Sequence, residues 1–118
     1  MTGIETTVID WINRHAPDGY KASHQTPTGA DGRLVTIERT GGTRDHITQT
    51  ATISAQVWSP NRKEAERTAD RIADILLDMW AIPQIADIDI QSITHNPNPG
   101  PPYRERYQIT ATITATTA

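Results

Sequence analysis

The side chains best placed to do chemistry are the charged residues of the segment 61–80. Acidic residues recur there every four positions, and basic residues recur at the same interval in a neighbouring row. Residues four apart in an α-helix lie on successive turns of one face. Both rows are therefore predicted to face away from the apolar stripe of a helix. The acidic row is Glu66, Asp70, Asp74 and Asp78, and the basic row is Lys63, Arg67 and Arg71.

These two rows have two interpretations. In the first, they form a solvated helix face with ion pairs between the rows, each contributing a few tenths of a kcal/mol. In the second, like charges are stacked along the helix because a partner subunit neutralises them. The second interpretation makes the rows a subunit or partner interface.

A second candidate interface is the segment "NPNPGPPYRERY", residues 96–107. Its prolines restrict the loop, so the loop loses less entropy on docking than a flexible one would. The alternation that follows predicts two tyrosines on the apolar side of a strand and two arginines on the other side, facing the acidic row of a neighbouring subunit. The residues concerned are Pro97, Pro99, Pro101, Pro102, Tyr103, Arg104, Arg106 and Tyr107.

No residue pattern predicts a catalytic, cofactor-binding or metal site. The Gly41-Gly42 pair is followed by a strand-like alternation and not by the helix and Lys-Ser/Thr pair of a phosphate-binding loop, so we expect a hairpin turn there. Four histidines are spread over separate loop or terminal regions without ligand spacing, and we expect exposed, untethered imidazoles. They are His15, His24, His46 and His95. Two arginines in an acidic chain do not predict specific binding of nucleic acid.

The composition describes one domain, residues 1–118, with a formal charge of −3 and no Cys. Fifteen Ile, three Leu, three Val and no Phe make up only 21 of the 118 residues. A domain with so few large apolar residues commonly buries further surface against neighbouring subunits. No apolar run is long enough to span a membrane and no signal-peptide pattern opens the chain, so we expect no membrane partner and synthesis in the cytoplasm.

Periodicity predicts two helices and two hairpins. The first helix is expected from about Gly3 to Arg14, with Thr2 and Glu5 in capping-box spacing. The second begins at Asn61, with Glu64 in the same spacing, and its apolar stripe is expected to be Ala65, Ala69, Ile72, Ala73, Leu76, Met79 and Trp80.

The strands alternate with a period of two. Short strand character is expected at 20–24. Strands at 34–39 and 47–58 are expected to pair across the Gly-Gly turn. A strand near 88–93 is expected to carry a bulge close to Gln91 or Ser92. The last strand, from Tyr103 to Thr117, is long enough that part of it is expected to extend beyond the core. The fold class is α+β, with a single mainly antiparallel or mixed sheet of about four main strands packed with two helices.

Three stretches together resemble a known family. They are "IERTGG" at a strand end, "ATISAQVWSPNRKEAERTADRIADIL" as strand then helix, and "PNPGPPYRERYQITATITA" as loop then strand. Between about Leu34 and Ala115 the chain resembles the tail terminator proteins of long-tailed, siphovirus-type bacteriophages, particularly those of actinobacterial hosts. The signature residues are Arg39 with Gly41-Gly42, Trp58 with Ala65 and Ala69, and Arg106-Tyr107.

The resemblance implies a structural virion protein and not an enzyme. It implies a homohexameric ring that caps the head-proximal end of the tail tube, ends tube polymerisation and offers a surface for head attachment. The implied partners are other copies of the chain, the major tail tube protein and the head-tail connector protein. DNA would pass through the ring without specific binding. Assembly would take place in the host cytoplasm, and the final location would be the virion tail.

Two alternatives remain open. The first is a head-tail connector or another neck protein of the same fold group. The second, from a different class, is a small ligand-binding or enzymatic α+β oligomer, because fold alone does not determine function.

Overall fold

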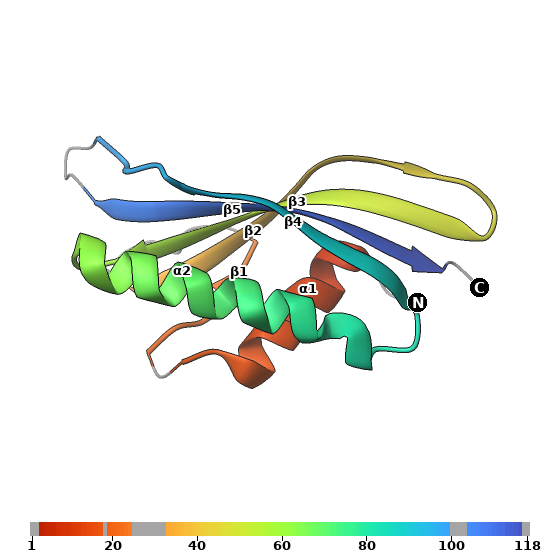
Figure 1. Cartoon of the computed structure of the whole chain (residues 1–118), viewed down its shortest axis with the longest axis horizontal. Coiled ribbons are helices and arrows are strands. Elements are labelled where there is room, and N and C mark those ends of the chain that lie inside the picture. The colour runs from red at the N-terminus through yellow and green to blue at the C-terminus, as the bar shows by residue number, and fades with distance from the viewer. Residues whose placement is uncertain (1–2, 18, 25–32, 100–103, 117–118) are drawn as a thin grey trace.

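Two helices lie on one face of a five-stranded sheet (Figure 1). The computed structural model describes residues 3–17, 19–24, 33–99 and 104–116. Its elements are α1 (Ile4–His15), β1 (Ala22–Ser23), β2 (Leu34–Arg44), β3 (Thr48–Ser59), α2 (Arg62–Leu77), the 3-10 helix η1 (Asp78–Ala81), β4 (Ile85–His95) and β5 (Glu105–Thr116). The α+β fold with a mixed sheet is confirmed, because β1 pairs in parallel with β2 and the other pairs are antiparallel.

The last strand, β5, lies inside the sheet, where the strand order is β1-β2-β3-β5-β4. Its residues pair with β3 from Glu105 to Thr116 and with β4 from Tyr107 to Ala115. The prediction that part of this strand extends beyond the core is therefore wrong. Its length is matched by two neighbours of 11 and 12 residues, which gives a molecule with extents of 44 × 25 × 24 Å.

The two faces of the sheet differ sharply in composition. On β3 and β5 every second side chain packs under the helices, and all of these apolar side chains are buried; they are Ala51, Ile53, Ala55, Val57, Tyr107, Ile109, Ala111, Ile113 and Ala115. The alternating positions point to the opposite face and are mainly Thr, Ser and Gln. Figure 1 shows no helix on that side. We call it the open face.

Helix α2 starts as predicted. The Asn61 side chain accepts a 2.9 Å hydrogen bond from the backbone N–H of Glu64, which is an N-cap. Ala65 and Ala69 are fully buried, so the helix lies close to the sheet. Trp80 is an exception to the predicted stripe, because its side chain is 62% exposed. The α-helix gives way to η1 before this residue, and the change from 3.6 to 3 residues per turn rotates Trp80 outward while Met79 stays buried.

The Gly41-Gly42 pair is not a hairpin turn, which corrects the prediction. Strand β2 continues through both glycines to Arg44, and the register shifts by one residue between Arg39 and Gly41. The turn comes later, where the Asp45 carboxylate accepts bonds from the N–H groups of Ile47 and Thr48 at 2.9 and 2.8 Å. The extra residue of this β-bulge is Thr40, and the two glycines follow it directly in the strand. A strand still follows them, as expected, and no helix N-terminus is present beside them.

Other boundaries agree closely with the prediction. Helix α1 is shifted by one residue, with Gly3 as N-cap; the proposed Thr2 cap lies outside the described residues. Strand β1 falls within 20–24, and β4 has the expected bulge, between Ile90 and Ser92. None of the helices in the described parts of the chain is long and apolar enough to cross a bilayer.

The two glycines after the bulge allow a prediction about stability, in which Gly41 is the control for Gly42. Gly42 has a φ of +140°, and an added Cβ there would lie 2.1 Å from the carbonyl oxygen of Thr50. Gly42→Ala should therefore cost about 1–3 kcal/mol of unfolding free energy, measured by urea denaturation. An added Cβ at Gly41 meets nothing within 4 Å, so Gly41→Ala should change stability far less. Equal effects of the two substitutions on the free energy of unfolding would show that the backbone conformation of Gly42 does not require glycine.

Candidate functional site

The predicted interface residues divide into two surfaces on opposite sides of the sheet. The charged rows belong to α2, which packs on the covered face. Arg106 is the cross-strand neighbour of Trp58 and lies on the open face. Tyr107 points the other way and is 7% exposed within the core. One copy of the chain therefore does not bring its two arginines close to its own acidic row.

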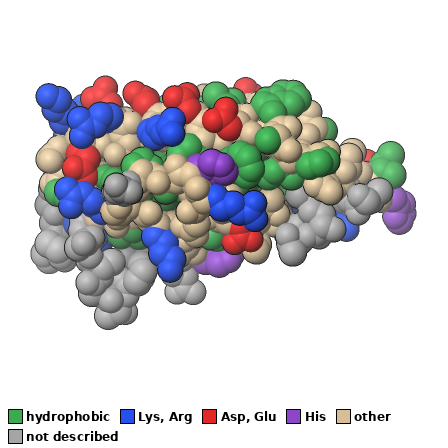
Figure 2. All heavy atoms as spheres, turned by 90° about the horizontal axis from the view of Figure 1, so that it is seen from below, with side chains coloured by type: hydrophobic (Ala, Val, Ile, Leu, Met, Phe, Trp, Pro, Cys, Tyr) green, Lys and Arg blue, Asp and Glu red, His purple; other side chains and the backbone are tan. Residues whose placement is uncertain are grey.

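The charged face of α2 is exposed as predicted. Every residue of the two rows is exposed, and none makes an ion pair or a side-chain hydrogen bond with another described residue. Figure 2 shows acidic side chains in a row along one edge of the helix side, with basic side chains gathered mainly toward one end. The ion pairs between the rows that the solvated-face interpretation requires are absent from this part of the chain.

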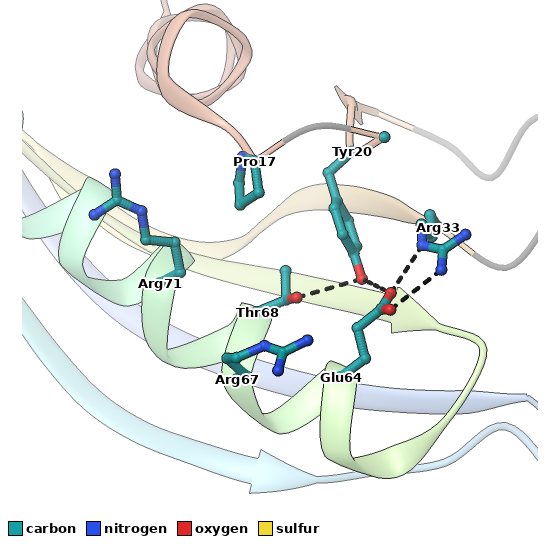
Figure 3. A pocket seen from close by; sticks show the side chains of 8 residues that line it. Pro17, Tyr20, Arg33, Glu64, Arg67, Thr68 and Arg71 are labelled. Carbon is teal, nitrogen blue, oxygen red and sulfur yellow. Dashed lines mark hydrogen bonds and ion pairs between the residues drawn. The ribbon is translucent and has the colours of Figure 1, made fainter.

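A polar cluster lies beside the first turns of α2 (Figure 3). Glu64 accepts hydrogen bonds from Arg33 Nε and Nη2 at 2.8 and 3.1 Å, and from the Tyr20 hydroxyl at 2.6 Å. The Tyr20 oxygen in turn accepts a 3.3 Å bond from Thr68 and lies 2.6 Å from Ser59 Oγ. These contacts fix the segment after α1 against α2.

The cluster alters the acidity of its members. The hydrogen bond from Arg33, followed by the one from Tyr20, lowers the pKa of Glu64. Burial, followed by the bond to Glu64, raises the pKa of the Tyr20 hydroxyl. Glu64 is therefore ionised and Tyr20 neutral at pH 7, so the network carries one Arg–carboxylate pair and no further charge.

A cavity of about 730 Å³ opens next to this cluster. Its lining consists of Pro17, Gly19, Tyr20, Arg33, Glu64, Arg67, Thr68 and Arg71. Figure 3 shows Arg67 and Arg71 projecting from successive turns of α2 on this side. Because Glu64 is already paired with Arg33, the described lining has an uncompensated positive charge at these two arginines.

The second surface is built around Trp58 on the open face. The guanidinium carbons of Arg104 and Arg106 lie 4.6 and 4.9 Å from the centre of the Trp58 ring. Both distances are typical of cation–π contacts. Arg106 Nε donates a 2.7 Å bond to the Asn96 carbonyl, and burial lowers the pKa of Arg106. The two arginines cover Trp58, which is only 5% exposed. Their contacts with the ring, and the bond from Arg106 to Asn96, therefore stabilise the folded chain.

The loop beside this stack is partly described. Pro97 and Pro99 lie in it, and Asn98 forms an isolated antiparallel bridge with Arg104 that extends the β4–β5 pairing. His95 Nε2 lies 2.8 Å from a carboxylate oxygen of Glu105 at the base of the loop. The predictions for Pro101, Pro102 and Tyr103 lie outside the described residues.

Three of the four histidines, His15, His24 and His95, correct the prediction of untethered imidazoles. His15 Nδ1 lies 2.8 Å from the Trp11 carbonyl oxygen. His95 contacts Glu105, and His24 Nδ1 lies 2.8 Å from Glu5. His15 is exposed but stacks on Trp11, with ring centres 4.2 Å apart. Among the described residues no group of three His, Cys, Asp or Glu side chains could hold a metal ion.

Sequence reasoning missed the cluster of Tyr20, Arg33 and Glu64, as well as the role of Trp58. Tyr20 and Arg33 flank a stretch interpreted as loop, and Glu64 was assigned only to helix capping. One signal was available: Trp58 falls on the polar register of its strand, where a large aromatic ring needs a partner to cover it.

Comparisons with known proteins add no relatives. No protein-family model matches the chain, and no curated protein matches it. The two surfaces and the cavity are therefore the basis for assigning a function.

The Glu64 cluster predicts a specific pH dependence of stability. Its pKa is lowered on folding, so its contribution to stability is present above the unfolded-state pKa and is lost as the pH falls through the folded-state pKa. The urea midpoint of the wild type should fall between about pH 5 and pH 3, and Glu64→Gln should show a shallower fall that meets the wild-type curve at low pH.

The control for this experiment is Glu66→Gln, which removes an exposed carboxylate on the same helix that forms no ion pair or side-chain hydrogen bond with a described residue. The urea midpoint of this variant should fall with pH as steeply as that of the wild type. If the urea midpoint of Glu64→Gln also fell as steeply, the Arg33–Glu64–Tyr20 network would not stabilise the fold.

Proposed function

We propose that the protein is a structural subunit of a bacteriophage virion that assembles into a ring at the head-proximal end of the tail tube. The ring ends tube polymerisation and provides the surface to which the head attaches. The subunit is not an enzyme, and its partners are its own copies, the major tail tube protein and the head-tail connector protein. DNA passes through the ring without specific binding.

The observation that carries this proposal is the long sheet with an uncovered polar face. Strands β3 and β5 are 12 residues each, and the helices protect one side of them only. The exposed side consists of short hydroxyl and amide side chains, which can contact a protein neighbour or water at little desolvation cost. Such a subunit is suited to lateral assembly.

The residues of the family resemblance fall at structural positions with defined roles, which supports the proposal. Gly41 and Gly42 directly follow the β2 bulge, Ala65 and Ala69 set the close packing of α2, and Trp58 lies under Arg106. A head-tail connector or another neck ring would use the same features, and it remains the second candidate within the virion.

A small ligand-binding or enzymatic α+β oligomer is the candidate from another class. One observation favours it, the cavity of about 730 Å³ beside Arg67 and Arg71. Retention of a metabolite through purification would support this candidate over the structural role.

Tube length tests the proposal directly. Cells that produce the proposed partner, the major tail tube protein of the same virus, should form tubes of variable length when this protein is absent. Co-expression should shorten the tubes and place a ring on one end, as seen by electron microscopy. Tubes that keep the same length distribution and carry no ring would contradict the terminator role.

The proline loop provides a second test in the complete virus. Replacing Pro97, Pro99, Pro101 and Pro102 with Gly and Ser should leave the fold intact, because the two described prolines lie outside the buried core. Tails assembled with this variant should be overlong or lack heads. Normal-length tails on filled heads would show that the loop is dispensable.

A further inference from the structure

The two charged rows of α2 lie close together and yet do not neutralise each other. Within the described parts of the chain the ion pairs are Glu5–His24, Arg33–Glu64 and His95–Glu105, and no residue of either row takes part. Four carboxylates on one helix edge repel one another, a cost that an external partner of opposite charge removes. The rows therefore indicate a contact that a single copy cannot make.

The cavity beside α2 has the chemistry to receive carboxylates. Part of its lining is a hydrogen-bonded network. In this network Arg33 and Tyr20 donate to Glu64, and Thr68 donates to Tyr20. Arg67 and Arg71 are outside that network and make no described hydrogen bond or ion pair. Each guanidinium has five N–H donors in a planar fork that matches a carboxylate.

The spacing of the two sets of charges also matches. Arg67 and Arg71 are one helical turn apart, as are Asp70 and Asp74 in the acidic row. Four residues advance about 6 Å along the helix axis. Two carboxylates of one helix can therefore meet two guanidiniums of another at the same time, which favours a second copy of this chain over a small anion with a single acidic group.

We infer that the cavity beside α2 binds the acidic row of α2 from a second copy of the chain. Arg67 and Arg71 pair with carboxylates of the partner's row, centred on Asp70 and Asp74. Because the cavity and the row are different surfaces, one copy can offer its cavity to one neighbour and its row to another. Heterologous contacts of this kind close into a ring when the rotation from one copy to the next divides a full turn. The inference rests on the proposed self-assembly and names its contact surfaces.

The alternative basic partners for the acidic row are Arg104 and Arg106. They are less suitable because both stack on Trp58, and Arg106 also binds the Asn96 carbonyl. To reach a carboxylate of another copy they would have to give up contacts that cover a buried tryptophan. The structure therefore favours Arg67 and Arg71 over the pair expected from the sequence.

Charge reversal with mixing tests the contact. The cavity variant is Arg67→Glu with Arg71→Glu, and the row variant is Asp70→Lys with Asp74→Lys. Each variant alone places like charges on both sides of the contact, and its self-association should weaken at least about tenfold. In an equimolar mixture both kinds of contact join opposite charges, so sedimentation velocity should show assemblies of the wild-type size.

All four substituted residues are exposed, and circular dichroism with thermal melting checks that both variants fold. The matched control is Lys63→Glu, which changes a basic residue of the same helix that does not line the cavity. It should associate like the wild type.

The outcomes separate this inference from the proposed function. If the wild type assembles and the mixture of folded variants does not, the contact is wrong while the ring proposal stands. If the mixture recovers only dimers and the wild type is also dimeric, the contact is supported and the ring is contradicted. A wild type that is monomeric at all concentrations overturns both.

Discussion

The limited supply of large apolar side chains is the constraint on which the rest of the structure depends. Ile53, Ile109 and Ile113 all lie on one face of the central strands, together with the smaller residues that let α2 approach. The opposite face of β5 carries Arg106 and Gln108 and then Thr110, Thr112, Thr114 and Thr116. A second layer of helices would need apolar residues that the sequence does not contain. The sheet therefore keeps one face open, and that face must be compatible with water or with a polar partner.

The shortage of large apolar side chains also explains the polar cluster beside α2. The short β1 strand and the segment after α1 supply few apolar contacts, and hydrogen bonds among Tyr20, Ser59, Glu64 and Thr68 hold them to the helix instead. No buried side-chain nitrogen or oxygen among the described residues lacks a partner. Glu64 is hydrogen-bonded to Arg33 and Tyr20, and Arg67 and Arg71 form no ion pair or side-chain hydrogen bond with a described residue at the edge of the cavity. A requirement of the fold thus leaves two basic side chains available for the contact that we infer.

Local patterns predicted much of this structure, because they depend on local physics. The alternation of Ile and Ala with Thr in β3 and β5, the Asn61 cap of α2 and the β4 bulge are all visible as spacing in the sequence. Features that depend on distant partners were not predictable. Gly41 and Gly42 signal a tight turn when considered alone, and only the pairing of β2 with β3 shows that they continue the strand directly after a bulge.

The same distinction applies to the site residues. The exposure of both α2 rows followed from helical periodicity, whereas the exposure of Trp80 depends on the switch to a 3-10 turn. The contacts of His24 with Glu5 and of His95 with Glu105 join residues 19 and 10 positions apart, so no spacing rule for ligands could indicate them. The interior position of β5 likewise depends on where β4 returns to the sheet.

The central claim is that this subunit completes its buried surface by charge-complementary contacts with its own copies. Sedimentation equilibrium of the unmodified protein at about 0.1 M and about 1 M salt is the most direct measurement, because salt screens exposed charges strongly over this range. The account predicts one closed oligomer of defined size at low salt and substantial dissociation at high salt. A protein that remains monomeric at both salt concentrations, across the accessible range of protein concentration, would contradict it.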